Sequence, residues 1–355
     1  MNARVDRLVD LPVDHPSPSR LIGPDGRIRL GVFDAAVDVV NHADFVYRDP
    51  FGKPRGRLAR HFGFHQFQFL GGLSEQLVFG CAIIDTRWVS TAFVYCYDPA
   101  TRRRVEHSAR RPLGMGVTFV DTPEVGTVSF VAGAARFAMH ADAAPRQRRL
   151  EVAAGPISID ATFSEETPAM EPMRICTRAG ATGWVYARKT AGLGMRGTLR
   201  WDDRVFDLGA IGIHGHHDWS AGFMRRETFW NWGCLAGRTS DGKIAGLNVS
   251  CGVNETSVTE NCFWIDGRLH KVDTVAFDYD QRDLMKPWRL RSSDGRVALE
   301  FTPEGMHVER LNAFVLATNF HQLFGRFRGT LTTAAGERHA VENLLGFCED
   351  HYAKW

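Results

Sequence analysis

The stretch GIHGHHDWSAG, at residues 212–222, places three histidines and an aspartate within five positions. Side chains alternate between the two faces of a strand, so His214 and His216 would share a face if this stretch is β. Imidazoles and a carboxylate at this density can hold a metal ion, transfer protons, or simply form the polar end of a strand. The chemistry therefore depends on the elements that carry the stretch.

Asp218 is the candidate proton donor of this stretch. Burial beside Trp219 and the imidazoles would raise its pKa, whereas a charged histidine would lower it. A raised pKa would make Asp218 an acid near neutral pH. His217, or Glu260 in a later polar segment, could then activate water or remove a proton.

A metal site is the second interpretation of the same residues. The word H-x-H-x-D is similar to one in metallo-β-lactamase-like hydrolases, with Trp219 where those enzymes carry another histidine. A catalytic metal needs a third protein ligand, for which His321, His351 and Glu260 are available. Those enzymes alternate strands with helices, and this chain shows little helical periodicity. A metal-dependent hydrolase remains an alternative.

Aromatic residues accompany the polar ones. Trp230 and Trp232 would share one strand face, and His65 lies among phenylalanines in RHFGFHQFQFLGG. Such stripes are usually core, but an aromatic-lined β cavity with a few polar groups also holds small apolar ligands. Asn248, a polar residue in an apolar strand, could orient a ligand. The predicted substrate-binding residues are Trp219, Trp230, Trp232, His216, Asn248 and His65.

Composition limits the classes of protein. The chain has 355 residues, 44% hydrophobic and 24% charged, with a formal net charge of +2. This balance is typical of a globular protein and predicts no nucleic-acid partner. No apolar run is long enough for a membrane span, and no signal-peptide pattern is present. The seven scattered cysteines indicate reduced thiols, so we expect a cytoplasmic protein.

The spacing of turns predicts an all-β fold. Residues 91–97 are β-branched and aromatic and end at Asp98-Pro99, and residues 229–235 and 244–250 flank another turn. Turns recur about every ten residues, which fits sandwiches or barrels. We expect an irregular lead at 1–25, an N-terminal β domain at 26–190 and a C-terminal β domain at 191–355.

A weak internal repeat agrees with two halves. The word RGTL begins at Arg196 and again at Arg328. Each copy is followed by a hairpin and then by a cluster of glycine, acid, histidine and tryptophan. Four-residue matches also arise by chance, so the repeat alone leaves a duplication open.

Several segments resemble a widespread bacterial family, domain of unknown function 2804. They are FVYCYDPATRR, HHDWSAG, FWNWGCLAGR, SVTENCFWIDGRLHKVDTVAFDYD, MKPWRLR, HQLFGRFRGT and LLGFCEDHYAKW. The resemblance runs from about residue 20 to the C-terminus. It implies no activity.

More distantly, the word G-x-H-G-H-H-D-W-S resembles G-x-G-Y-x-D-H-x-W-G of carotenoid 1,2-hydratase and its relatives. That resemblance implies paired lipocalin-like β domains and cofactor-free addition of water to an alkene. The acid would be Asp218 and the motif tryptophan Trp219. His216 stands where the motif has tyrosine, and the order of His and Asp differs, so fold transfers more firmly than chemistry.

These observations predict two lipocalin-like antiparallel halves and an acid–base enzyme that needs no cofactor. We expect a hydratase, dehydratase or isomerase acting on an isoprenoid or other lipid-like alkene or alcohol. The alternative is a non-catalytic carrier of hydrophobic ligands. We expect no integral membrane association, while a homo-oligomer is possible.

Overall fold

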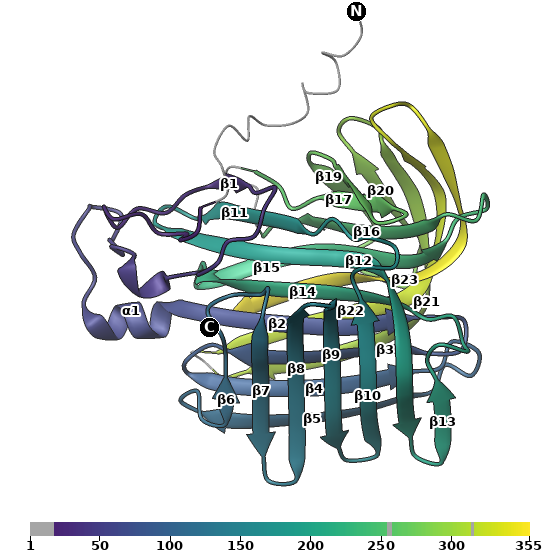
Figure 1. Cartoon of the computed structure of the whole chain (residues 1–355), viewed down its shortest axis with the longest axis horizontal. Coiled ribbons are helices and arrows are strands. Elements are labelled where there is room, and N and C mark those ends of the chain that lie inside the picture. The colour runs from purple at the N-terminus through teal and green to yellow at the C-terminus, as the bar shows by residue number, and fades with distance from the viewer. Residues whose placement is uncertain (1–17, 254–257, 314–315) are drawn as a thin grey trace, which may run out of the picture.

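The computed structural model describes residues 18–253, 258–313 and 316–355, and it is built almost entirely of antiparallel strands (Figure 1). The helical elements of this part are the 3₁₀ turn η1 (His42–Asp44) and helix α1 (Arg57–Gly63). None of the helices in the described ranges is long and apolar enough to cross a membrane. The all-β prediction is confirmed.

The first sheet contains the strands up to Phe223. Its order is β5-β4-β3-β2-β14-β12-β10-β9-β8-β7-β6, with β1 paired to β11 and both β11 and β13 paired to β12. The strands are β1 (Gly31–Val32), β2 (Phe64–Leu73), β3 (Val78–Asp85), β4 (Val89–Tyr97), β5 (Arg104–Pro112), β6 (Val117–Thr118), β7 (Gly126–Ala132), β8 (Ala135–Ala143), β9 (Arg146–Ala154), β10 (Ile157–Ser164), β11 (Met173–Ala179), β12 (Gly183–Trp201), β13 (Arg204–Asp207) and β14 (His214–Phe223).

The second sheet contains the rest of the chain. Its order is β18-β17-β16-β15-β23-β22-β21-β20-β19. The strands are β15 (Glu227–Arg238), β16 (Ile244–Cys251), β17 (Cys262–Ile265), β18 (Arg268–Lys271), β19 (Val275–Asp278), β20 (Trp288–Ser292), β21 (Val297–Asn312), β22 (Ala317–Thr332) and β23 (Arg338–Lys354).

The two sheets repeat one topology. The run β5-β4-β3-β2-β14-β12-β10 corresponds, strand for strand, to β18-β17-β16-β15-β23-β22-β21. The two RGTL words fall on the corresponding strands β12 and β22. Gly197 and Gly329 have φ of 121° and 140°. A Cβ there would lie 2.1 Å from Asp160 O and 2.2 Å from Ala298 O, respectively. The repeated glycine therefore serves the same close strand approach in each lipocalin-like half.

The change of sheet falls between Phe223 and Glu227. The predicted division at residues 190/191 lies inside β12, which pairs with β10 and β14 of the first sheet along its length. Pairing partners therefore assign residues 191–223 to the first sheet. Composition changes little across this segment, so the sequence offered no marker of the change.

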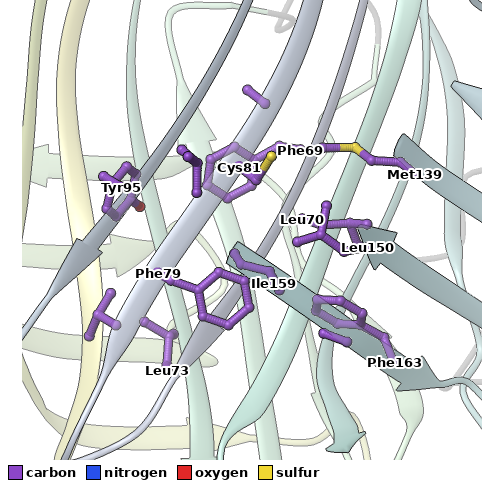
Figure 2. Close-up of a cluster of buried hydrophobic side chains, with 14 of the residues drawn as sticks. Phe69, Leu70, Leu73, Phe79, Cys81, Tyr95, Met139, Leu150, Ile159 and Phe163 are labelled. Atoms are coloured by element: carbon purple, nitrogen blue, oxygen red, sulfur yellow. The ribbon is translucent and has the colours of Figure 1, made fainter. Parts of the chain in front are cut away.

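One buried apolar cluster fills the first half and continues into the contact with the second sheet, and a second cluster lies within the second half. Figure 2 shows part of the first, with labelled side chains from β2, β3, β4, β8, β9 and β10. The second contains Leu247, Trp288, Phe301 and Phe327. Between them, the outer faces of the two sheets meet through the central strands β12, β14, β15 and β16. Residues on those facing strands form the site described next.

Candidate functional site

The alternation of β14 divides the HHDW word between two environments. His216 and Asp218 point toward the second sheet, where the His216 ring lies 5.4 Å from that of Phe347. His217 and Trp219 point into the first half, where His217 meets Gln68 and Trp219 packs against Tyr186. The structure therefore does not bring His217 or Trp219 to Asp218.

Lys189 on β12 joins Asp218 to Glu260. It lies opposite Asp218 in the strand register. Its Nζ is 3.0 Å from Asp218 Oδ2 and 2.6 Å from Glu260 Oε1. Burial lowers the pKa of Lys189, but the two carboxylates outweigh burial and raise it. Sequence reasoning brought Asp218 and Glu260 forward but missed the lysine between them.

Asp218 is buried in this cluster. Burial raises its pKa and the Glu260 carboxylate adds to the rise, while Lys189 opposes it. The Ser220 hydroxyl donates a hydrogen bond to Asp218 Oδ1 at 2.9 Å. With two carboxylates around one ammonium, the ionised cluster carries a single net negative charge.

A second buried carboxyl, Glu349 on β23, faces the same space. The Trp230 indole donates to its Oε2 at 3.0 Å, and the Gln322 amide donates to its Oε1 at 2.7 Å. Glu349 is 4% exposed. Burial raises the pKa of Glu349 to about 7, and the charge of Asp218 contributes to the rise. Glu349 is therefore poised to carry a proton near neutral pH.

Asp218 and Glu349 occupy equivalent positions in the two halves. Each is the fourth residue of a word beginning with glycine, Gly215-His-His-Asp218 and Gly346-Phe-Cys-Glu349. Asp218 lies between Lys189 of β12 and Phe69 of β2, and Glu349 lies between the corresponding strands β22 and β15. Glu349 is thus the acid of the second repeat cluster, as Asp218 is of the first.

Aromatic side chains surround these carboxyls. The Phe69 ring lies 6.0 Å from that of Trp232, which in turn is 4.9 Å from that of Phe347. The Trp232 indole donates to Asn248 Oδ1 at 2.8 Å, and the Asn248 amide donates to the Glu260 carbonyl at 3.0 Å. Trp232 and Asn248 thus lie in the site and orient the segment that carries Glu260.

His65 lies on the same sheet face as Asp218 but farther along β2. Its ring packs edge-on against Trp355 at 5.5 Å, and its Nε2 is 3.2 Å from the Phe62 carbonyl. Trp355 in turn lies 6.3 Å from Trp230. His65 therefore belongs to the aromatic end of this face and not to the cluster around Lys189.

Both ring nitrogens of His216 have no hydrogen-bond partner within the described ranges. The Tyr95 hydroxyl is also buried and interacts with the Gln322 side chain. Burial lowers the pKa of His216 to about 3, so its ring is neutral. Glycines make room for these groups, because a Cβ at Gly71 would lie 2.5 Å from His216 Nε2 and one at Gly80 would lie 2.5 Å from the Tyr95 hydroxyl.

A cavity of about 190 Å³ opens where β4 and β5 meet β21. Tyr95 and His307 line it, and His307 is the strand partner of Gln322. Since Gln322 bonds to Glu349, the cavity is separated from that carboxyl by one strand.

In the described part of the chain, no third metal ligand joins the histidines of the H-x-H-x-D stretch at His214 and His216. No cluster of three or more histidine, cysteine, aspartate or glutamate side chains there is arranged to hold a metal ion. Of the proposed third ligands, His321 is 3.1 Å from an Arg310 nitrogen, and His351 is 2.8 Å from the Thr318 hydroxyl.

Three solved structures share the fold. A protein assigned as AttH from Nitrosomonas europaea is 14% identical, with a TM-score of 0.51 over 81% of this chain and 92% of its own. Kievitone hydratase from Nectria haematococca is 10% identical, with a TM-score of 0.51 over 81% and 88%. The protein CghA is 10% identical, with a TM-score of 0.52 over 82% and 88%.

At these identities the likeness is one of fold alone, and it agrees with the two lipocalin-like halves. No protein of curated function matches this sequence. One family model does match, over residues 17–355 and thus over nearly the whole length. The chain belongs to the family described as domain of unknown function 2804 (DUF2804).

Proposed function

We propose that this protein is an acid–base enzyme of the hydro-lyase type, which adds water to, or removes it from, a largely apolar substrate. The observation that carries the proposal is the pair of buried carboxyls at equivalent positions of the two halves. Glu349 meets only neutral donors and has a pKa near 7, whereas Asp218 is held by an ammonium. Two carboxyls in different environments are the usual basis for separate acid and base roles.

In the hydration direction, Glu349 donates its proton to one carbon of an alkene, and the other carbon becomes a cation. Water adds to that cation and releases a proton to Asp218, which gives the alcohol. Proton exchange with solvent then returns Glu349 to its acid form and Asp218 to its carboxylate. Dehydration follows the same steps in reverse, and loss of a proton from a neighbouring carbon instead gives an isomerised alkene.

The electrostatics of the site suit a cationic intermediate. The Lys189–Asp218–Glu260 cluster carries one net negative charge, which stabilises positive charge that develops nearby. The faces of Trp230 and Trp232 can add cation–π stabilisation of about 1–2 kcal/mol each when desolvated. The Lys189 ammonium lies 5.2 Å from the Trp232 ring centroid, so one face of that ring already contacts a cation.

The proposed substrate is an isoprenoid or similar lipid-like alkene or tertiary alcohol. Aromatic walls favour an apolar skeleton, and the two unpartnered ring nitrogens of His216 favour one oxygen function on it. The structural neighbour named kievitone hydratase agrees with this class of reaction, although its likeness is one of fold.

The test is incorporation of solvent deuterium into carbon. Purified protein is incubated in D₂O with terpenoid alkenes and tertiary alcohols, and the products are examined by mass spectrometry. We expect deuterium at one carbon, and we expect Glu349→Gln to abolish the exchange. Glu342→Gln, an exposed position on the same strand, is the matched control.

The opposite result would support the carrier alternative. A carrier would bind the same compounds in native mass spectrometry without exchange, and its binding would tolerate both Asp218→Asn and Glu349→Gln. That outcome would contradict the enzymatic proposal while keeping the apolar ligand.

A further inference from the structure

A second buried polar cluster lies inside the first half, on the face of the first sheet opposite to Asp218. Glu165 accepts hydrogen bonds from Arg148 at 2.9 Å and from two nitrogens of Arg188 at 2.9 and 2.6 Å. Glu124 accepts from Arg174 at 2.7 Å and from Arg188 at 3.2 Å. The acid–base site makes no use of these residues.

The charges of this cluster do not balance. The guanidinium groups of Arg148, Arg174 and Arg188 face two carboxylates, which leaves one positive charge among buried side chains. Arg146 also approaches Glu165, but its side chain is 37% exposed and solvent screens it. Burying a net charge without a counterion is costly.

His217 presents a hydrogen-bond donor to this cluster. Gln68 Nε2 lies 3.2 Å from His217 Nε2. An amide nitrogen can only donate, so with the Gln68 amide oriented as in this structure, Nε2 of the imidazole is the acceptor. Burial and the nearby arginines hold the pKa of His217 well below its usual value, so the ring is neutral. Its single proton is then on Nδ1, which has no partner among the described residues.

Two more donors lie beside this one. Thr190 is the strand partner of His217, and Trp219 is the strand partner of Arg188. Thr190 Oγ1 and Trp219 Nε1 are buried and have no partner in the described ranges. A threonine hydroxyl can also accept, but an indole N–H only donates. The Tyr186 hydroxyl, two positions from Arg188 on β12, is likewise unpartnered and can donate or accept. Each of these groups can therefore donate to an added acceptor, next to one uncompensated positive charge.

We propose that the interior of the first half binds a small monovalent anion, of halide size, between Arg148, Thr190 and His217. One negative charge would neutralise the cluster, and a spherical acceptor would satisfy donors that come from different directions. The ion would lie behind β14, on the opposite face from Asp218, so this site is independent of the proposed hydro-lyase activity.

Bromide is the probe for this site. Halide-free protein in sodium gluconate is titrated with sodium bromide at constant ionic strength, and the melting temperature is recorded. An ion that binds only the folded state raises the melting temperature with a saturable dependence. Crystals grown in bromide are then measured at the bromine absorption edge. We expect one anomalous peak within hydrogen-bond distance of Arg148 and Thr190.

The variant Thr190→Val removes one donor and keeps the shape of the side chain. We expect it to weaken bromide binding about tenfold, the effect of losing a hydrogen bond to a charged group. Thr228→Val, another buried strand threonine but in the second half, is the matched control and should bind as the parent does.

Three results would overturn the proposal. They are density for water without an anomalous peak, a peak at crystal concentration with no saturable shift in solution, and equal bromide affinity in both threonine variants. If Thr190→Val does not fold, the melting curves and the anomalous map of the unaltered protein still show whether bromide binds at this site.

Discussion

Glu349 differs from the other buried carboxyls in its partners. Asp218 and Glu260 share the Lys189 ammonium, and Glu165 lies between guanidinium groups, whereas Glu349 receives only an indole and an amide. Neutral donors offset only part of the cost of burying its charge, so its pKa rises to about 7. Its proton is therefore available where the proposed reaction needs it.

Activity should therefore depend on a protonated Glu349. The proton-donating form predominates below about pH 7 and is lost above it, so the rate of deuterium incorporation should fall about tenfold per pH unit on the alkaline side. The rate is measured from pH 5 to 9 on the substrate identified by the exchange assay. A flat profile across pH 7 would remove Glu349 from the role of proton donor.

The raised pKa of Glu349 also makes the free energy of unfolding depend on pH. The folded state keeps the Glu349 proton up to about pH 7, whereas the unfolded chain releases it near pH 4.5. The free energy of unfolding should thus decrease by about 3 kcal/mol as pH rises from 4.5 to 7, through this group alone. Urea unfolding of the parent and of Glu349→Gln, measured at several pH values, gives this contribution as the difference between their free energies of unfolding. If the two proteins show parallel pH profiles, the pKa of Glu349 is not raised.

Sequence reasoning identified part of the site at the scale of single residues. Asp218, Glu260, Trp232 and Asn248 do lie together, because density of polar and aromatic residues is visible in the sequence. Period-2 alternation already separates Asp218 from His217 and Trp219 once the stretch is taken as a strand. Lys189 could not be found this way, since its approach to Asp218 depends on the pairing of β12 with β14.

At the scale of elements, the row Tyr95–Gly80–Gly71–His216 runs across four neighbouring strands, β4, β3, β2 and β14. The two glycines have no side chains, so the rings of the outer two residues lean over them. In the structure Gly71 lies within a strand because a ring from β14 occupies the place of its side chain.

Substitution of Gly71 by alanine should be destabilising. The added Cβ would lie 2.5 Å from His216 Nε2 and 2.8 Å from the backbone oxygen of Phe79, and backbone cannot move aside easily. We expect a loss of about 1–3 kcal/mol, typical of overpacking in a well-packed core. Gly209→Ala is the control, since its Cβ would meet only ordinary contacts, the nearest at 3.4 Å. Equal thermal stabilities of the two variants would show that the His216 ring can move.

At the scale of the whole molecule, two sheets of equal topology meet back to back and place equivalent carboxyls in one interface. The all-β class followed from turn spacing, and the two halves from the repeat and the resemblance. The extent of each half did not follow, because β12 and β14 complete the first sheet only through pairing with β10 and β2. Such pairing depends on long-range register, which local sequence does not specify.

The Lys189–Glu260 contact links the two halves, since Lys189 belongs to β12 and the Glu260 backbone is bonded to Asn248 of β16. In Lys189→Met, Asp218 and Glu260 would remain buried as like charges without their cation. We expect a loss of about 3–5 kcal/mol near neutral pH, because one partner of a buried ion cluster is removed. The loss should shrink as pH falls, because the pKa of Asp218 is raised and its protonation removes one of the two like charges.

The neutral triple variant Lys189→Met, Asp218→Asn, Glu260→Gln separates charge from packing. It removes all three charges together, and we expect it to recover most of the stability that Lys189→Met loses. Its activity should be absent, because the Asp218 carboxylate is gone. Urea unfolding of the three proteins, followed by tryptophan fluorescence, gives the comparison. If the triple variant is as unstable as Lys189→Met, packing of the lysine stem, and not charge compensation, holds the sheets together at this point.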